Sequence, residues 1–144
     1  MVSAGTLEST RAFGIAWRCV IDQTVQQLAA DVFSRNCMSR TVLETVTGKW
    51  AVLALVALHE GPHRFGELRR RVDGVSEKML SQTLHNLEQD GLVNREVRSA
   101  IPPHVEYTLT PLGAGLAPRL LALVDFIEGA MPEVLAAREA RGDA

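Results

Sequence analysis

The sequence has few cysteines, little net charge and no long apolar run. Two cysteines in 144 residues are too few for a disulfide framework, and they fit a reducing compartment. The formal net charge of −2 argues against a polycation, so any affinity for nucleic acid must come from a local arrangement of charge. The longest uninterrupted apolar run, Trp50 to Leu58, is far shorter than the roughly 20 residues that span a bilayer. These shortages argue against a disulfide-stapled domain and against a membrane span.

The composition is that of a globular protein. Hydrophobic residues make up 47% and charged residues 22%, and 144 residues suit one domain that buries about two-thirds of its unfolded surface. The N-terminus has no basic segment ahead of an apolar core, and Arg18 interrupts the apolar stretch from Phe13 to Ile21. That pattern argues against a secretory signal. We therefore expect a cytoplasmic protein.

Helical periodicity accounts for most of the chain. Apolar residues recur at helical spacing over residues 10–33, which predicts a long amphipathic helix. Over residues 40–59 they cover so much of the circumference that this second helix is expected to be the buried centre, ended by Gly61 and Pro62. A short helix is expected over residues 64–72.

A capped helix and a β-hairpin are expected next along the chain. Ser76 is an N-cap residue for a helix that stops at Gly91. Beyond Gly91 the apolar period changes from near four to two, which predicts two strands. The alternating residues are Val93, Arg95 and Val97, then Val105, Tyr107 and Leu109. Pro102 and Pro103 lie between the strands, so we expect a loop longer than a two-residue turn.

One face of the helix from Ser76 carries neither an acidic nor an aliphatic side chain. On a helical wheel its apolar residues share one side, while the opposite side and its flanks carry amide, imidazole, hydroxyl and ammonium groups. These polar residues are Lys78, Ser81, Gln82, His85, Asn86 and Gln89. Such groups can donate to phosphates and to base edges in a major groove. Taken alone, the same stripe also fits an ordinary solvated helix face.

The order of the elements decides between these two interpretations. A short helix, a turn with Gly74, the helix from Ser76 and a hairpin bearing Arg95 and Arg98 together match a winged helix-turn-helix. Further cations that can meet phosphates are Lys49, Arg64, Arg69, Arg70 and Arg71. Residues 62–104 nevertheless hold seven Lys or Arg against six Asp or Glu. This slight positive balance predicts moderate affinity per protomer and a need for two recognition helices.

Over about residues 37–118 the sequence resembles the HxlR family of bacterial winged-helix transcription regulators. The resemblance rests on "TGKW", "GPHRFGELRRRVDGVSEKMLSQTLHNLEQDGLVNREV" and "IPPHVEYTLTPLG", in this order. It implies a homodimer held by terminal helices and bound to a palindromic DNA operator. The helix from Ser76 would read bases, and residues 95–104, with His104, would form the wing. The fold class expected is mainly α with a small β-hairpin, an α+β winged helix-turn-helix.

This interpretation divides the chain into three regions. Residues 1–36 form an N-terminal arm and dimerisation helix, residues 37–111 form the DNA-binding domain, and residues 112–144 form C-terminal dimerisation helices. The last helical segment begins with Thr110 as N-cap and Pro111 as first helical residue, at the boundary of the third region. Two long amphipathic helices have more apolar surface than one small core absorbs, which favours burial between two protomers.

Cys37 is the candidate sensor thiol. Many relatives carry an oxidant- or electrophile-sensing cysteine just before the second helix, and Cys37 has that position in this sequence. Arg35, Arg40 and a nearby helix N-terminus would favour the thiolate, the form that oxidants attack. The alternative is a buried, inert thiol. For Cys19, within the first helix, packing is the simpler expectation.

Catalysis and metal binding find little support. "HEGPH", residues 59–63, satisfies the H-E-x-x-H zinc pattern, but Gly61 and Pro62 would disrupt the helical turn that must align both histidines. No Ser/His/Asp grouping or phosphate loop is recognisable. We expect no enzyme, no cofactor and no metal site.

The sequence thus predicts a DNA-binding transcription regulator, more specifically a repressor. This interpretation allows a small-molecule or oxidant effector, and Phe13, Trp17 and Phe126 are hypothetical lining residues of an apolar ligand pocket. Two alternatives stay open: a winged-helix protein-interaction module, and a regulator of the MarR type that responds to a small ligand.

Overall fold

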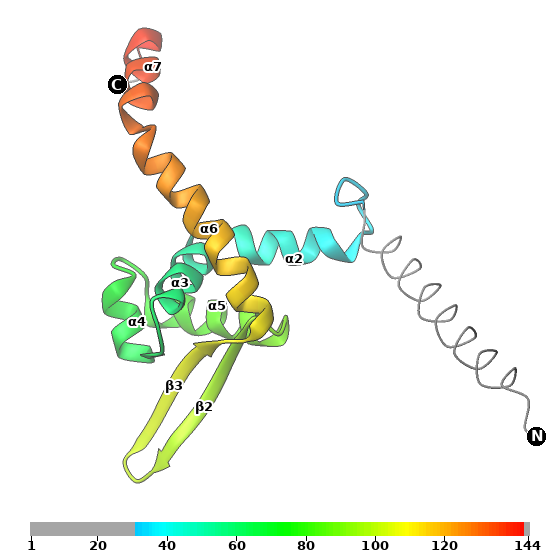
Figure 1. Cartoon of the computed structure of the whole chain (residues 1–144), viewed down its shortest axis with the longest axis vertical. Helices are drawn as coiled ribbons and strands as arrows, with labels where there is room; N and C mark the ends of the chain where they lie inside the picture. Colours follow the sequence, from blue (N-terminus) through cyan, green and yellow to red (C-terminus); the bar gives the residue numbers. More distant parts are fainter. Residues whose placement is uncertain (1–30, 143–144) are drawn as a thin grey trace, which may run out of the picture. The chain divides into compact units, whose positions relative to one another are not determined.

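The computed structural model describes residues 31–142 (Figure 1). The chain divides into two compact units between Glu44 and Thr45. Of the helix expected over residues 10–33, only the last three residues are described, and none of these three is helical. The rest of that helix, with Phe13, Trp17 and Cys19, lies outside the described residues.

The helix expected over residues 40–59 is two helices. Helix α2 spans Met38–Thr47 and α3 spans Lys49–His59, with Gly48 between them at φ −57° and ψ 138°. Continuous helix was therefore a wrong prediction. The apolar pattern runs through Gly48, but glycine costs about 1 kcal/mol relative to alanine inside a helix, and the chain leaves helical geometry at that residue.

Helix α3 is the buried centre of the second unit, as the sequence predicts. Ala54 and Leu55 are fully buried, and α3 packs against α4, α5, α6 and β3. The core around it takes residues from every neighbouring element, among them Leu68, Leu80, Leu84, Leu87, Val93, Tyr107 and Leu120. Burying each leucine side chain contributes roughly 1.5–3 kcal/mol, so these contacts provide the main stabilisation of the unit.

Helix α4, Phe65–Arg71, and helix α5, Glu77–Gln89, form the helix-turn-helix. The Glu67 carboxylate accepts the Arg64 backbone N–H at 2.8 Å at the start of α4. Ser76 caps α5 as expected, since its Oγ accepts the Met79 N–H at 3.1 Å. Gly91, at φ +73°, follows α5 in the left-handed conformation that favours glycine.

The sheet has three strands rather than the expected two. Strand β1, His63–Arg64, pairs antiparallel with β3, Pro103–Leu109, and β3 pairs antiparallel with β2, Val93–Ala100. Figure 1 shows β2 and β3 extending together from the helices as a long hairpin. A strand of two residues carries no detectable alternation, so β1 was missed.

The loop at the hairpin tip is shorter than predicted. It contains only Ile101 and Pro102, which are joined by a cis peptide bond. Pro103 opens β3 instead of extending the loop, because the first residue of a strand tolerates proline. The register shifts between Val97 and Ser99, which leaves Arg98 as the extra residue of a bulge.

Helices α6, Pro111–Gly129, and α7, Met131–Arg141, follow the sheet and are the last elements of the described residues. Thr110 caps α6 as expected: its hydroxyl accepts the Gly113 N–H at 3.0 Å and donates to the Gly91 carbonyl at 2.6 Å. A side chain at Gly113 would collide with the Leu92 backbone carbonyl, so only glycine fits this close approach. Within residues 31–142 no single helix combines the length and apolar composition of a membrane span; only the broken pair α2 and α3 would do so, by length and composition alone.

Candidate nucleic-acid interface

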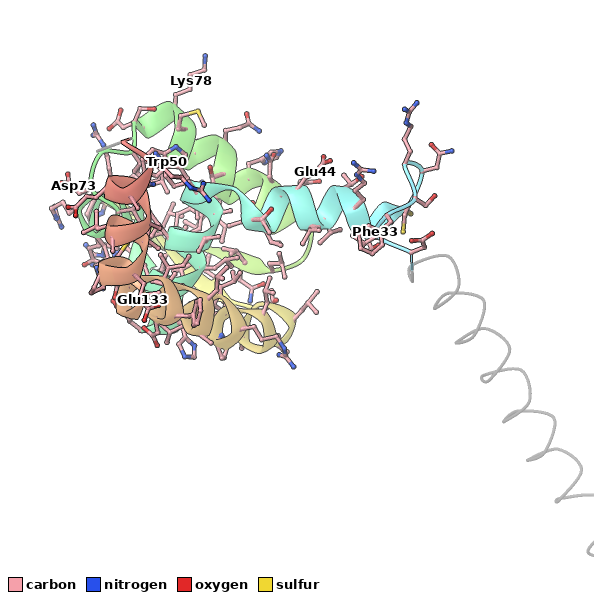
Figure 2. The ribbon with its side chains drawn as sticks, turned by 90° about the horizontal axis from the view of Figure 1, so that it is seen from above. Phe33, Glu44, Trp50, Asp73, Lys78 and Glu133 are labelled. Carbon is pink, nitrogen blue, oxygen red and sulfur yellow. The ribbon has the colours of Figure 1, made fainter. Side chains whose placement is uncertain are left out.

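The outward face of α5 is uncovered. Leu80, Leu84 and Leu87 are buried on its inner face, whereas Lys78, Gln82 and His85 are exposed on the opposite one. The Lys78 side chain extends away from the protein in Figure 2. The remaining expected members Ser81, Asn86 and Gln89 are exposed as well. The helical wheel therefore describes the two faces of α5 correctly.

Two amides on this face are hydrogen-bonded to each other. Gln82 Nε2 donates to Asn86 Oδ1 at 2.9 Å, one helical turn away. In this pair, the carbonyl oxygen of Gln82 can still accept a hydrogen bond, and the amide group of Asn86 can still donate one. Together they present one acceptor and one donor from a restrained pair, the combination that bidentate recognition of an adenine edge needs.

One apolar residue of the same face, Met79, was not among the residues predicted from the sequence. Met79 is 46% exposed and lies next to Gln82 and Asn86 on the wheel. A thioether there can pack on a thymine methyl group, which only the major groove displays. The signal was present in the sequence, since an apolar residue stands among polar ones on the outward side of the helix.

Ser76 has a structural role at the start of α5. Its oxygen is the helix cap, and the neighbouring Glu77 carboxylate pairs with Arg69 at 3.1 Å. This pair joins α4 to the first turn of α5. The Ser76 hydroxyl proton remains available for a phosphate oxygen.

Two of the cations named from the sequence already have a partner in the structure. Arg71 binds both carboxylate oxygens of Glu60, at 3.0 and 2.5 Å, and this hydrogen bonding lowers the pKa of Glu60 and raises the pKa of Arg71. Lys49 Nζ lies 4.2 Å from the centroid of the Trp50 ring. Among residues 31–142, no ion pair engages Arg64, Arg70, Lys78 or Arg95.

The wing arginines have different surroundings. The register of β2 and β3 places Glu96 opposite Glu106, and the Arg98 guanidinium lies 3.0 Å from the first and 3.2 Å from the second. His104 Nε2 is 3.9 Å from Glu106. Arg98 thus separates two carboxylates that would otherwise repel each other across the strands. Arg95 is exposed and pairs with no carboxylate in the described part of the chain.

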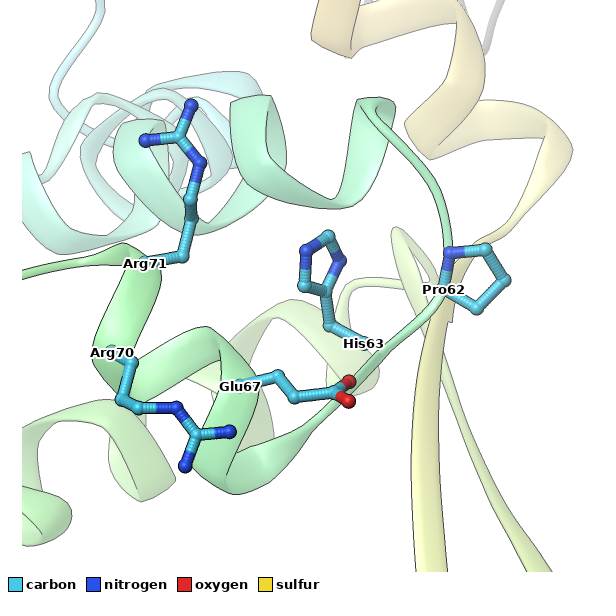
Figure 3. Close-up of a pocket in the computed structure, with 5 residues that line it drawn as sticks. All are labelled: Pro62, His63, Glu67, Arg70 and Arg71. Atoms are coloured by element: carbon cyan, nitrogen blue, oxygen red, sulfur yellow. The ribbon is translucent and has the colours of Figure 1, made fainter.

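A shallow hollow lies beside α4. Pro62, His63, Glu67, Arg70 and Arg71 line it (Figure 3). His63 Nδ1 hydrogen-bonds the Gly61 carbonyl at 2.7 Å, and Gly61 has φ +145°. Since α3 ends at His59 and His63 belongs to β1, the two histidines of the zinc pattern do not share a helical face.

Cys37 lies in the first unit, immediately before α2, and is 8% exposed. Its Sγ is 2.9 Å from the Ser39 hydroxyl oxygen. That hydrogen bond lowers the pKa of the thiol, assisted by backbone N–H groups at the start of α2 and opposed by partial burial. The stabilising group is therefore the Ser39 hydroxyl with the helix terminus, and not the Arg35 and Arg40 side chains named from the sequence.

Of the hypothetical ligand-pocket residues, only Phe126 is described. Its side chain is 74% exposed on α6. It belongs to a row of exposed apolar residues along α6 and α7: Leu123, Phe126, Ile127, Met131, Val134 and Leu135.

Comparison with known proteins gives consistent matches. The HxlR-like helix-turn-helix family matches residues 45–134. The HTH-type transcriptional regulator YtfH of Escherichia coli K12 is 56% identical over 117 residues, which are 81% of this chain and 93% of that protein. The solved structure of YtfH from Salmonella typhimurium superposes with a TM-score of 0.72 at 55% identity, covering 76% of this chain and 97% of that one. The redox regulator HypR in its reduced form gives a TM-score of 0.63 at 34% identity, covering 68% and 97%.

These matches confirm three expectations from the sequence: the resemblance to a known regulator family, the winged-helix fold, and a role outside catalysis. The relatives are transcriptional regulators and not enzymes. The third strand, β1, modifies the expected hairpin without changing the fold class.

Proposed function

Because this chain belongs to the HxlR-like helix-turn-helix family of transcriptional regulators, we propose that it represses transcription as a homodimer bound to a palindromic DNA operator. Helix α5 enters the major groove, and the β2–β3 hairpin follows the neighbouring backbone as a wing. Such a protein works where the DNA lies, in the cytoplasm.

The observation that carries this proposal is the outward face of α5. Lys78, Gln82 and His85 are all exposed, and no carboxylate lies among them. Carboxylates on that face would be repelled by phosphate, whereas amide, imidazole and ammonium groups can donate to phosphates and bases. Ser81, Asn86 and Met79 extend the same surface with further polar and apolar contacts.

The phosphate contacts come from cations around α5. Arg64, at the start of α4, and Arg95, on β2, are exposed, and their guanidinium groups form no ion pair within residues 31–142. Lys49, Ser76 and His104 add donors near the turn and the wing. Arg98 contributes less, because two carboxylates compensate its charge.

Dimerisation uses the exposed apolar row on α6 and α7. An isolated chain would leave Phe126, Ile127 and Leu123 in water, and such patches commonly mark interaction sites. A two-fold pair presents two recognition helices, which a palindromic operator matches with its two half-sites. This arrangement also supplies the affinity that the weakly positive domain lacks alone.

The effector is an oxidant that acts on Cys37. The lowered pKa of this thiol increases its thiolate fraction, and HypR, a structural neighbour, carries the name of a redox regulator. Oxidation of Cys37 to a sulfenic acid by a peroxide, or to a disulfide with a second thiol while diamide is reduced to its hydrazine, would release the operator. A Cys37→Ser protein that keeps its response to diamide would contradict this part of the proposal.

The deciding experiment is a binding titration on promoter DNA. Fluorescence anisotropy would compare a fragment from the chain's own or adjacent promoter with a shuffled fragment, at several salt concentrations, with diamide and with reductant. We expect preference for the promoter fragment and a steep loss of affinity with salt, because released counterions accompany phosphate contacts. Affinity that ignores both sequence and salt would instead indicate a protein-interaction module.

A further inference from the structure

A second hollow lies between α3, the α4–α5 turn and α6, entirely within the second unit. Its volume is about 260 Å³. The apolar part of its lining includes Leu53 and Val56 of α3 and Leu121 and Val124 of α6. This size is near the lower end of small-molecule sites, about 300 Å³, so the hollow suits a compact ligand.

The rim of this groove is acidic. Glu60, Asp73, Asp125 and Glu128 line it, together with a single cation, Arg71. Arg71 is held by Glu60, so the charges of these two residues cancel. Within residues 31–142 no ion pair engages Asp73, Asp125 or Glu128. Three carboxylates therefore surround an apolar floor without a counter-charge from the described chain.

This combination selects for one kind of occupant. DNA and organic anions would be repelled by the rim, and a neutral apolar molecule would gain nothing from the exposed carboxylates at its edge. The described residues contain no group of three or more His, Cys, Asp or Glu arranged to hold a metal ion. A cation with an apolar body satisfies the floor and the rim together.

We propose that this groove binds a small lipophilic organic cation, such as a tertiary amine or a quaternary ammonium compound. The apolar body lies against Val56 and Val124, and the charged nitrogen lies among Asp73, Asp125 and Glu128. Because Asp73 belongs to the turn that joins α4 to α5, the bound cation contacts the helix-turn-helix itself. This site is distinct from Cys37 and from the exposed Phe126 row.

The test is calorimetric titration of the full chain with benzyltriethylammonium, in the absence of DNA. An anion with an apolar body, 4-tert-butylbenzoate, is titrated in parallel. We expect saturable binding of the cation at one site per chain and no binding of the anion. Since no DNA is present, the result stands or falls separately from the proposed operator binding.

A pair of matched variants assigns the site. In Asp125→Asn/Glu128→Gln the groove loses two charges, and cation affinity should fall on the order of tenfold. The control Glu133→Gln/Glu139→Gln removes two exposed charges from α7, outside the groove, and should bind as the wild type does. Both pairs keep side-chain shape at exposed positions, and circular dichroism would verify their folding.

Three results would overturn the proposal. The first is no saturable binding of the cation, and the second is equal binding of the anion. The third is equal cation affinity in the groove variant and the wild type. A second copy of the chain is the competing occupant of the groove, and sedimentation velocity tests for it. If the groove variant dissociates to monomers while the control does not, a second copy fills the groove, and the cation site is wrong.

Discussion

Helix α5 and the wing hairpin differ in how their polar groups are used. The outward face of α5 keeps Lys78 and His85 without carboxylate partners in the described chain, whereas the wing binds Arg98 between Glu96 and Glu106. The inner face of α5 is fully buried on leucines, while Val97 of the wing is 61% exposed. Helix α5 therefore has a well-packed inner face and an outer face whose polar groups are open to a partner, whereas the wing is less packed and part of its charge is neutralised.

The largest expected effect concerns this difference in support. Leu84→Ala should lower the free energy of unfolding by about 2–5 kcal/mol, because it opens a cavity beneath α5. Val97→Ala in the wing should change it by no more than about 0.5 kcal/mol. Urea denaturation followed by circular dichroism measures both. Equal losses would show that the wing is as firmly packed as α5.

The next largest effect is on the free energy of operator binding and concerns the contacts of α5 with the bases. Gln82→Ala and His85→Ala should each cost about 1–3 kcal/mol of binding to the operator, with less effect on shuffled DNA. His59→Ala, an exposed histidine at the end of α3, is the matched control and should bind as the wild type does. Anisotropy titrations at one salt concentration would measure the three. Equal loss on both DNAs would refute base reading.

The wing should show the opposite behaviour. Glu96→Gln removes one of the two partners of Arg98, so affinity should rise by up to about 1 kcal/mol on every sequence alike. Glu133→Gln on α7 changes net charge equally without touching the wing. A gain restricted to the operator would mean that the wing reads sequence.

The phosphate contacts of the two wing arginines, Arg95 and Arg98, can be compared through the salt dependence of DNA binding. Arg95→Ala should weaken binding to operator and shuffled DNA together, and should reduce the slope of log affinity against log salt by about one. Arg98→Ala should have a smaller effect on that slope, since its charge is already compensated. Identical slopes for the two variants would show that Arg98 leaves its carboxylates when DNA binds.

The smallest effect is on stability and depends on pH. The hydrogen bond from Arg71 lowers the pKa of Glu60 below its ordinary value of 4.5. The pair therefore stabilises the fold above that value, and this contribution disappears as the pH falls through the lower folded pKa. Glu60→Gln should lower the urea midpoint slightly at pH 7, and its difference from the wild type should shrink steadily as the pH falls below 4.5. A difference that stays constant over this range would exclude the ion pair as its cause.

The structural features that were predicted correctly are those set by residues close together in the sequence. Both ends of α5 were located because Ser76 and Gly91 are local signals that act within one turn of the helix. The buried role of α3 was likewise readable from its apolar circumference. The break at Gly48 was hidden because the apolar rhythm continues across it.

What the sequence could not show depends on pairing across the chain. The partners of Arg98 follow from the register of β2 on β3, which a bulge shifts by one residue. The same holds for β1, which exists only because β3 lies beside it. For Cys37 a usable signal was present: Ser39, two residues later at a helix start, is the group that lowers the thiol pKa.

Thr110 joins the end of α5 to the beginning of α6. Its hydroxyl contacts the Gly91 carbonyl and the Gly113 N–H at once, and Gly113 lies directly against the Leu92 backbone. A joint this short and this tightly packed leaves little room for independent movement. A displacement of α6, caused by a second copy or by a small molecule, would therefore also displace the segment that ends α5, and in the proposed complex it would change the angle at which α5 meets the DNA.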